Sequence, residues 1–316
     1  MQPQPDLGHP ADLYPTRVDA ARVIPRREAV VWGSSSNGPL TNDELAHYDR
    51  TGYLQIPELV TADEVEAMRA ELHRLSCDPK VLADERTIAE GGRAPTDSGE
   101  ITVRSIFQIH ESNDLFAAIA HDSRVVERAR QVLGSDVYIH QSRVNFKPGF
   151  KGKDFFWHSD FETWHAEDGM PLPRAVSISI SLTDNHTFNG PLMIMPGSHR
   201  EFVSCVGATP VNHHRESLVM QGVGTPAPET LRTFADRYGI AVLTGASGGA
   251  TMFDSNCMHA SNGNVTPFSR SNLFLVFNSM ENVCGEPFAA PARRPEHLAT
   301  RNPHPVIPRP SEEQTR

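Results

Sequence analysis

From Gly134 onward the chain becomes a succession of short β-like runs, and this change of pattern restricts its fold more than any other feature of the sequence. The clearest run is 175–182, where apolar and hydroxyl side chains alternate and therefore occupy opposite faces of one strand. The other runs are 137–139, 144–146, 192–195, 250–253 and 272–277. Short strands separated by Gly, Pro and Asn turns, with helices before them, predict a mostly β fold: an antiparallel barrel or jelly roll with helical decoration.

The residues before Gly134 favour helices. A short helix is predicted to open at 41–44, and 61–64 reads as a capping box ahead of apolar residues that share one helical face. Those apolar residues are Val65, Met68, Leu72 and Leu75. Residues 80–100 are polar and rich in turn formers, and a further helical stretch runs from about 114 to 133, where Gly134 ends it.

The chain is expected to form a single domain over residues 41–290. Residues 1–40 are rich in Pro, Ser and Gly and are interpreted as an extended or partly mobile arm, and 291–316 as an irregular proline-rich tail whose last part is disordered. The segment 200–245 interrupts the β pattern with a helical patch around 229–238, and we interpret it as an insertion.

Charge and composition exclude several classes of partner. There are 29 Lys plus Arg against 39 Asp plus Glu, a formal net charge of -10, and no long basic run, which argues against nucleic-acid and membrane-surface binding. No apolar window approaches the length of a membrane span, and the N-terminus lacks the pattern of a signal peptide, so a cytoplasmic protein is expected. The four cysteines are scattered, without a C-x-x-C pair, and are expected to be free thiols.

A metal site is indicated by His158-Ser159-Asp160 together with His259. In an extended segment, residues i and i+2 point to the same face and lie about 6.6 Å apart, so both side chains can reach one ion. His259 follows the run 250–253 and a turn at 254–256, which can direct it across a barrel. Two imidazoles and one carboxylate on one face are typical of non-haem Fe(II) oxygenases, because they leave three octahedral positions open.

The H-x-D pattern is weakly specific on its own. Most of the 15 histidines are expected at surface or capping positions, and His158 and Asp160 taken alone are more often of that kind. A second copy of the pattern, His47-Tyr48-Asp49, lies in a helical segment, where residues i and i+2 diverge by about 200° around the axis. We reject this second copy as a ligand pair.

Arg270, 11 residues after His259, supports the metal interpretation. An arginine at the start of an apolar strand can pair with a carboxylate in a pocket, although a surface charge at a strand start is the alternative. Together with the triad it matches the needs of 2-oxoglutarate, whose keto-acid end chelates iron while its far carboxylate requires a fixed cation. Because the co-substrate is a dianion, a further cation is expected nearby; Lys147 is the candidate, and a solvated edge lysine is its alternative.

One long motif carries a family resemblance. Residues 156–171 (FWHSDFETWHAEDGMP) are similar to the signature of the ectoine hydroxylases, a branch of the phytanoyl-CoA dioxygenase superfamily. The likeness extends over about residues 12–290. It includes DLYP at 12–15, the strand 141–147, NGPL at 189–192, PGSH at 196–199, MHASN at 258–262 and RSN at 270–272.

The resemblance implies a double-stranded β-helix, a cupin-like jelly roll, that hydroxylates ectoine to 5-hydroxyectoine with 2-oxoglutarate and O2 as co-substrates. Such a reaction belongs to compatible-solute biosynthesis under osmotic and heat stress.

The implied Fe(II) ligands are His158, Asp160 and His259. The residues implied to hold 2-oxoglutarate are Lys147, Arg270 and Ser261. The implied ectoine pocket consists of Gln141, Phe155 and Trp164, with Arg143, Asn145 and Phe274 as further candidates. Aromatic faces suit the cyclic amidinium of ectoine, and ordinary core packing is the alternative role for Phe155 and Trp164.

Two other functions stay open at this point. The same oxygenase machinery could act on another small amino-acid-like substrate, or the chain could be a jelly roll that binds a solute with zinc or without metal. The combination of the triad with Arg270 disfavours a binder, because a binder has no need for vacant metal positions. A homodimer is a possible assembly, and no nucleic-acid or membrane partner is expected.

Overall fold

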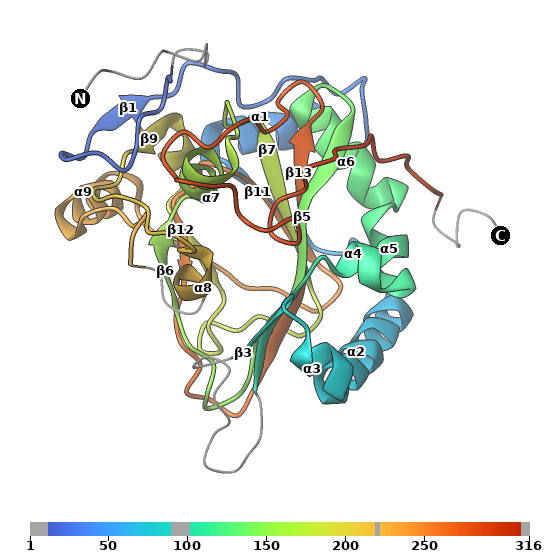
Figure 1. Ribbon diagram of the computed structural model, residues 1–316. Helices are drawn as coiled ribbons and strands as arrows, with labels where there is room; N and C mark the ends of the chain where they lie inside the picture. Colours follow the sequence, from blue (N-terminus) through green and yellow to red (C-terminus); the bar gives the residue numbers. More distant parts are fainter. Residues whose placement is uncertain (1–11, 90–101, 219–221, 311–316) are drawn as a thin grey trace.

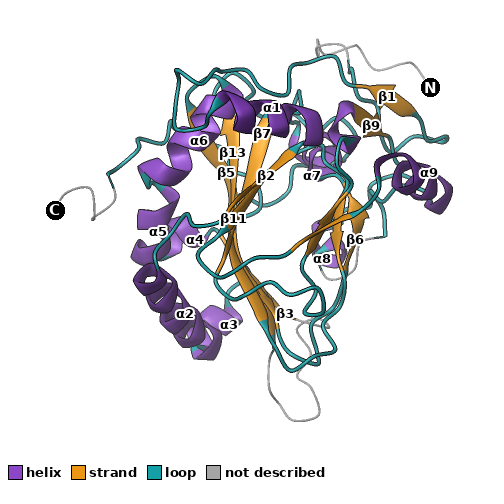
Figure 2. Cartoon of the chain, turned by 180° about the vertical axis from the view of Figure 1, so that it is seen from behind, coloured by secondary structure: helices purple, strands orange, loops and turns teal. Residues whose placement is uncertain are grey.

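The computed structural model describes residues 12–89, 102–218 and 222–310, and in it two antiparallel sheets face each other while helices cover the outer face of the larger sheet (Figure 1). The helices α2, α5 and α6 lie side by side along that outer face (Figure 2). This arrangement is the expected jelly roll with helical decoration. None of the helices in these ranges is long and apolar enough to cross a membrane.

The larger sheet has seven strands and contains most of the β-like runs that the sequence predicts. In order across the sheet, its strands are β2 (Tyr53–Ile56), β11 (Ala250–Asp254), β7 (Ala175–Ser181), β13 (Arg270–Ser279), β5 (Val137–Lys147), β4 (Val103–Phe107) and β3 (Thr87–Ala89). The separate runs 137–139 and 144–146 are one long strand, β5. The strands β2, β3 and β4 were not predicted from the sequence, because they are only four, three and five residues long.

The smaller sheet has four strands and brings the candidate metal ligands together. Its order is β10 (Ala241–Leu243), β8 (Leu192–Ile194), β12 (His259–Ser261) and β6 (Phe155–His158). A further pair joins β1 (Val23–Pro25) to β9 (Glu201–Val203). Since β12 pairs with β6, residues a hundred positions apart in the sequence become direct neighbours.

The first two helices begin where the sequence predicts. Thr41 and Thr61 cap α1 (Asn42–Thr51) and α2 (Ala62–Cys77), and each forms a complete capping box with the glutamate three residues later. The expected apolar residues of α2 are buried. After the short α3 (Pro79–Ala83) and α4 (Ile109–Ser112), the predicted long helix 114–133 is instead two helices, α5 (Asp114–Ala120) and α6 (Ser123–Leu133). The break occurs because Asp122 accepts a hydrogen bond from the backbone N–H of Arg124 and thereby caps a new helix.

The alternation along β7 separates the main core from the cavity between the sheets. Val176, Ile178 and Ile180 are buried in the core that the helices cover. Ser179 lies on the other face and lines the cavity, while Ser177 donates a hydrogen bond to Asp160. The prediction of opposite apolar and hydroxyl faces for this strand is therefore confirmed.

The described parts of the arm and the tail pack against the domain. Arg17 is almost completely buried and pairs with Glu162, so this part of the arm, which the sequence describes as extended or partly mobile, is anchored to the domain. In the tail, Leu298 and Val306 are buried, and 291–310 contains neither helix nor strand, as predicted. Residues 1–11 and 311–316, to which the remaining expectations of mobility and disorder apply, lie outside the described residues.

The segment 200–245 contributes more than an inserted helix. The predicted helical patch is α9 (Pro228–Tyr238), and the short α8 (His214–Ser217) precedes it. However, the segment begins with β9, which pairs with β1, and ends with β10, which pairs with β8 of the smaller sheet. The interpretation as an insertion is wrong for these two strands, which are too short to show a pattern in the sequence.

Candidate metal centre and active site

A cavity of about 1140 Å³, including its open mouth, lies between the two sheets. Its wall combines charged, hydroxyl and aromatic side chains. It includes every candidate site residue named from the sequence. These are His158, Asp160 and His259; Lys147, Arg270 and Ser261; and Gln141, Phe155, Trp164, Arg143, Asn145 and Phe274.

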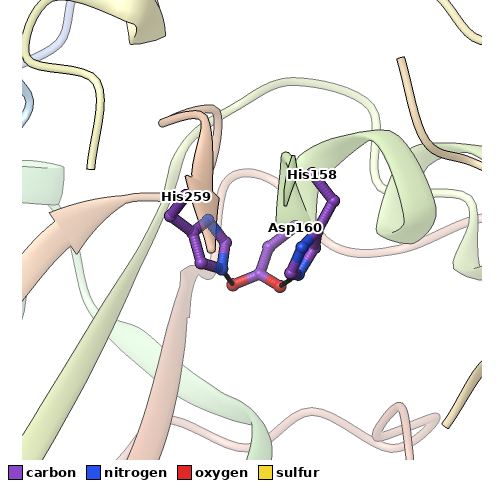
Figure 3. Close-up of side chains that lie close together, drawn as sticks. All are labelled: His158, Asp160 and His259. Atoms are coloured by element: carbon purple, nitrogen blue, oxygen red, sulfur yellow. Dashed lines mark ion pairs between the residues drawn. The ribbon is translucent and has the colours of Figure 1, made fainter. Parts of the chain in front are cut away.

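His158, Asp160 and His259 line this cavity, and their side chains lie close together (Figure 3). His158 ends β6, Asp160 begins the short helix α7 (Asp160–Thr163), and His259 begins β12 directly opposite His158. One nitrogen or oxygen atom from each residue lies within 4.8 Å of the other two. Nε2 of His158 is 3.6 Å from Oδ1 of Asp160, and Nε2 of His259 is 3.8 Å from Oδ2. This spacing leaves room for one ion between the three side chains.

The backbone orients both imidazoles toward that ion position. Nδ1 of His158 lies 2.6 Å from the carbonyl oxygen of Phe156, and Nδ1 of His259 lies 3.0 Å from that of Cys257. When Nδ1 carries the proton and donates it to a carbonyl, Nε2 is left unprotonated and free to bind a metal. Both rings therefore present a metal-binding lone pair to the carboxylate side of the cavity.

The electrostatics of the triad also suit a cation. Burial alone would raise the pKa of Asp160, but the two histidines and Arg143 hold it well below its usual range, so the carboxylate stays ionised. Burial, reinforced by the charge of His158, lowers the pKa of His259 to about 4, so its ring is neutral near pH 7. A neutral imidazole and an ionised carboxylate are the forms that ligate metals. Two histidines and one carboxylate with open positions fit Fe(II) best.

The turn 254–256 fixes the path of the chain between β11 and His259, as the sequence indicates. The backbone N–H of Phe161 donates to the carbonyl of Ser255, which joins this turn to α7 beside Asp160. The side-chain amide of Asn256 donates to the carbonyls of His199 and Glu201. The turn is thus held on both sides, so that ligands from distant strands keep a constant separation.

Arg270 and Lys147 face each other across β13 and β5 at one end of the cavity. Nζ of Lys147 donates to Oγ of Ser261 at 2.8 Å, and Nε of Arg270 donates to Oδ1 of Asn185 at 2.9 Å. Burial lowers the pKa of Arg270 to about 10, so the guanidinium remains charged at neutral pH. Two cations and a hydroxyl in a buried position form a receptor for a carboxylate.

Gly190, in the NGPL sequence, lies beside these cations. Its φ is +74°, a left-handed conformation that favours glycine. A Cβ atom at this position would lie 2.8 Å from Cδ of Lys147, so only glycine lets that side chain reach the cavity. The carbonyl of Gly190 also accepts a hydrogen bond from Nη1 of Arg270.

The remaining predicted residues form the wall on the other side of the triad. Gln141, Arg143 and Asn145 alternate along β5 and all line the cavity. Arg143 donates to Oε1 of Gln141, and its guanidinium lies over the ring of Phe274, 4.1 Å from the ring centre. Burial lowers the pKa of Arg143 to about 10, with the charges of Arg294 and Arg104 acting in the same direction. Trp164, only 2% exposed, begins a π-helix over Trp164–Asp168.

Several residues of the cavity wall were missed by the sequence reading. They are Ser105, Phe107, Phe146, Thr163, Ser179, Leu192, His213, Ser217, Leu218, Ala260, Asn272 and Arg294. Ser179 and Asn272 could have been found, because one lies on the hydroxyl face of the alternating strand and the other in the RSN sequence. Nothing in the sequence pattern marks Arg294, which lies in the proline-rich tail, or Leu218, which follows α8.

The second H-x-D copy plays no part in this site. His47, Tyr48 and Asp49 lie within α1, where Tyr48 is buried in the core and Asp49 pairs with Arg200. Its rejection as a ligand pair is confirmed, because the His158, Asp160 and His259 group is the one metal-type cluster found among residues 12–89, 102–218 and 222–310.

Comparisons with known proteins agree with this geometry. The family model for phytanoyl-CoA dioxygenase (PhyH) matches residues 48–272. The chain is 54% identical to the ectoine dioxygenase of Streptomyces avermitilis over 296 residues, which cover 93% of this chain and 98% of that protein. It is 50% identical to the ectoine dioxygenase of Halomonas elongata over 291 residues, covering 91% and 86% of the two chains.

Solved structures show the same similarity. The crystal structure of EctD from S. alaskensis with 2-oxoglutarate and 5-hydroxyectoine matches with a TM-score of 0.84 and 41% sequence identity, covering 95% of this chain and 99% of that one. The same protein with bound Fe matches with a TM-score of 0.83 and 40% identity over the same shares of the two chains.

Proposed function

Because the chain belongs to the ectoine dioxygenases of the phytanoyl-CoA dioxygenase family, we propose that it hydroxylates ectoine to 5-hydroxyectoine, with 2-oxoglutarate and O2 as co-substrates. The observation that supports this most is the joint placement of the His158, Asp160 and His259 triad and Arg270 in one cavity. The reaction serves the synthesis of a compatible solute, and we expect the enzyme to protect cells from osmotic and heat stress.

His158, Asp160 and His259 would hold the ferrous ion. The chemistry that this ion supplies, when bound, is the coupling of 2-oxoglutarate oxidation to succinate and CO2 with the insertion of one oxygen atom into ectoine. The protein orients both imidazoles through backbone carbonyls, and it keeps the imidazole of His259 neutral and the carboxylate of Asp160 ionised before any ion arrives. The site is therefore preorganised for the ion.

Lys147, Arg270 and Ser261 would bind the far carboxylate of 2-oxoglutarate. Arg270 is fixed by Asn185 and Gly190, so its remaining guanidinium N–H groups have a set direction. Nζ of Lys147 is likewise fixed by Ser261 and by the carbonyl of Asn262. Since both cations are already ordered, little conformational entropy is lost when the dianion binds.

The wall made by Gln141, Arg143, Asn145, Trp164 and Phe274 would bind ectoine. The carboxylate of ectoine suits Arg143, whose guanidinium is buried and stacked on Phe274. The amidinium of ectoine suits the face of Trp164. Such opposite anchors would orient the ring so that one carbon faces the metal position, and their burial excludes water from the reacting atoms.

Phe155 has a different environment from Trp164 and Phe274, the other aromatic candidates. The guanidinium of Arg104 lies 3.9 Å from the centre of its ring, and Nζ of Lys147 lies 5.7 Å away. This position is beside Lys147 and Ser261, two of the residues proposed to hold 2-oxoglutarate. We therefore propose that Phe155 forms a boundary between the two ligands.

We propose a cytoplasmic location, because the four cysteines are all free thiols, as expected in a reducing compartment, and because 2-oxoglutarate is a metabolite of that compartment. A homodimer is also a prediction, which light scattering during size-exclusion chromatography tests.

The test is anaerobic reconstitution with Fe(II) and 2-oxoglutarate, followed by admission of air with and without ectoine. We expect succinate and a product heavier than ectoine by one oxygen atom, in equal amounts. Parallel reactions with free proline and with N-acetylated diaminobutyrate test the alternative of another amino-acid-like substrate. Faster, coupled succinate formation with either would reject ectoine as the substrate, and no succinate with any of them would favour a binding protein.

A further inference from the structure

A second cluster of reactive side chains lies beside the cavity and takes no part in the proposed reaction. Sγ of Cys284 lies 3.8 Å from Nδ1 of His140, and Nε2 of the same ring lies 3.2 Å from Oδ2 of Asp168. The hydroxyl of Tyr138 donates to the same sulfur at 3.6 Å. A thiol, an imidazole and a carboxylate follow one another in hydrogen-bonding order, as they do where a protein activates a cysteine.

The fold builds this cluster with two irregular elements. Along β13, Val276 pairs with Gln141 and Phe277 pairs with Ile139, so His140 has no direct partner and forms a β-bulge in β5. Such a bulge redirects a side chain, and here the ring of His140 is completely buried. Asp168 is the last residue of the π-helix that begins at Trp164.

Accessibility distinguishes Cys284 from the other cysteines. Cys205 and Cys257 are buried, whereas Cys284 is half-buried. Cys77 is exposed at the end of α2, and its sulfur lies 3.9 Å from the hydroxyl of Ser76. Cys284 combines access from solvent with a neighbouring imidazole, and Cys77 therefore serves as a comparison within the same chain.

His140 is suited to accept the thiol proton. Burial lowers the pKa of His140, but the sulfur of Cys284 and the carboxylate of Asp168 outweigh burial and raise it to about 9. Asp168 is held ionised by a hydrogen bond at 2.8 Å from Nε of Arg294. Once Nδ1 has taken the thiol proton, the imidazolium lies between the sulfur of Cys284 and the carboxylate of Asp168, which both stabilise its positive charge.

We propose that Cys284 is a reactive thiol that hydrogen peroxide oxidises to a sulfenic acid, and that its modification is transmitted to the substrate cavity through His140, Asp168 and Arg294. In the reaction the thiol proton passes to Nδ1 of His140, and the thiolate sulfur attacks one oxygen of the peroxide. The S–O bond forms as the O–O bond breaks, the leaving hydroxide recovers the proton from His140, and one water is released. The sulfur is oxidised and the peroxide is reduced, so no further reactant is needed.

The route to the cavity consists of two direct contacts. Asp168 binds His140 with one oxygen and Arg294 with both, and Arg294 lines the cavity. The ring of His140 also meets Trp164 edge-on, with 5.2 Å between ring centres, and Trp164 lines the cavity as well. An added group on Cys284 displaces or recharges His140, and both cavity residues then lose a fixed neighbour.

The first experiment measures thiol reactivity without turnover. The iron-loaded full chain is treated anaerobically with iodoacetamide at pH 7, and each cysteine is followed by peptide mass spectrometry. We expect Cys284 to react at least about tenfold faster than Cys77, and His140→Gln to remove that difference. Cys205 and Cys257 should stay unlabelled, which reports that the variant is folded. If Cys284 reacts no faster than Cys77 in the wild type, this result alone refutes the proposal, and no variant is needed.

Peroxide sensitivity is tested on the zinc-loaded chain, because ferrous iron itself consumes peroxide, with dimedone as the trap for sulfenic acid. Labelling at Cys284 ahead of Cys77 is expected; equal labelling would overturn the proposed chemistry. This result stands whether or not the chain hydroxylates ectoine.

Transmission to the cavity rests on the proposed function and has its own test. After alkylation of Cys284, we expect the KM for ectoine to rise at least about threefold while the KM for 2-oxoglutarate stays within about twofold. Cys284→Ser should keep wild-type constants and lose sensitivity to alkylation. An alkylated wild-type enzyme with unchanged KM for ectoine would show that the cluster does not communicate with the cavity.

Discussion

Asn185 is predicted to determine how well the enzyme binds 2-oxoglutarate, although it lies at the edge of the cavity wall. Its Oδ1 accepts the hydrogen bond from Nε of Arg270, while its amide donates to Oγ of Ser181 at 2.7 Å. Its backbone is also fixed, because it forms an isolated bridge with Gly245. Asn185 therefore connects the guanidinium of Arg270 to the end of β7 and to the segment that follows β10.

The magnitude follows from the loss of one charge-assisted hydrogen bond in Asn185→Ala. Such a bond contributes about 1.5 to 3 kcal/mol, and each 1.4 kcal/mol is a factor of about ten in affinity. Arg270 retains its contact with the carbonyl of Gly190, so the lower end of the range applies. We expect the KM for 2-oxoglutarate to rise about tenfold, with little change in the KM for ectoine.

A matched control is available in the same loop. Asn189 is buried, and its side chain accepts from the N–H of His186 and donates to the carbonyl of Asp184, but it does not touch Arg270. Steady-state rates of succinate formation at varied 2-oxoglutarate are compared for Asn185→Ala and Asn189→Ala. If both variants raise the KM for 2-oxoglutarate equally, general loop damage explains the effect and the positioning role is refuted.

Three further predictions concern the metal, the co-substrate and stability. Asp160→Ala should lose iron, measured by metal analysis after desalting, and should form no succinate, whereas Asp49→Ala in the second H-x-D copy should retain both; turnover by Asp160→Ala would reject the triad. Arg270→Ala should mainly weaken 2-oxoglutarate, and a change confined to the KM for ectoine would mean that Arg270 serves the other ligand. Burial lowers the pKa of His110 to about 4, below the ordinary 6.5 of an unfolded chain. The unfolded state therefore binds the proton more readily than the folded state, and the protein loses stability as the pH falls from 6.5 toward 4. Between pH 7.5 and 5, His110 is expected to lower the free energy of unfolding by about 2 kcal/mol. Urea unfolding of the metal-free protein at these two pH values should therefore show about 2 kcal/mol less loss for His110→Asn than for the wild type. An equal loss in both proteins would contradict the assignment.

The structure gives His110 a local reason for remaining neutral. The backbone N–H of His110 donates to Oγ of Ser142, and Nδ1 of the ring lies 2.6 Å from the same oxygen. The hydroxyl of Ser142 can therefore donate its own proton to Nδ1 only while the ring is unprotonated. Protonation of the ring exchanges a good hydrogen bond for a buried charge.

Local sequence patterns predicted the elements whose signals are complete within a few residues. The capping boxes at Thr41 and Thr61 and the alternation along β7 each specify one element without help from the rest of the chain. The triad was also predictable, because the spacing of His158 and Asp160 in an extended segment places both side chains on one face, and Arg270 supported the metal interpretation. The long family motif extended this to the residues of both proposed ligand pockets.

The sequence could not reveal contacts that depend on tertiary pairing. The strand β4 is buried along its whole length and supplies Ser105 and Phe107 to the cavity, yet its five residues have no alternation. Arg17 and Arg294 lie in segments whose composition is typical of irregular chain. Their positions are determined by carboxylates far away in the sequence, Glu162 and Asp168, which no local pattern connects to them.

The placement of Arg17 and Arg294 has a consequence for how the enzyme is made. One belongs to the arm and the other to the tail, and each neutralises a carboxylate next to the proposed iron ligands or the substrate wall. In a chain made from its N-terminus, every proposed metal ligand precedes Arg294, which pairs with Asp168 and lines the cavity. The proposed site is therefore expected to be complete only once the chain extends through Arg294, and removal of the segment with Arg17 or of the segment with Arg294 should leave the metal ligands in place but Glu162 or Asp168 without its arginine.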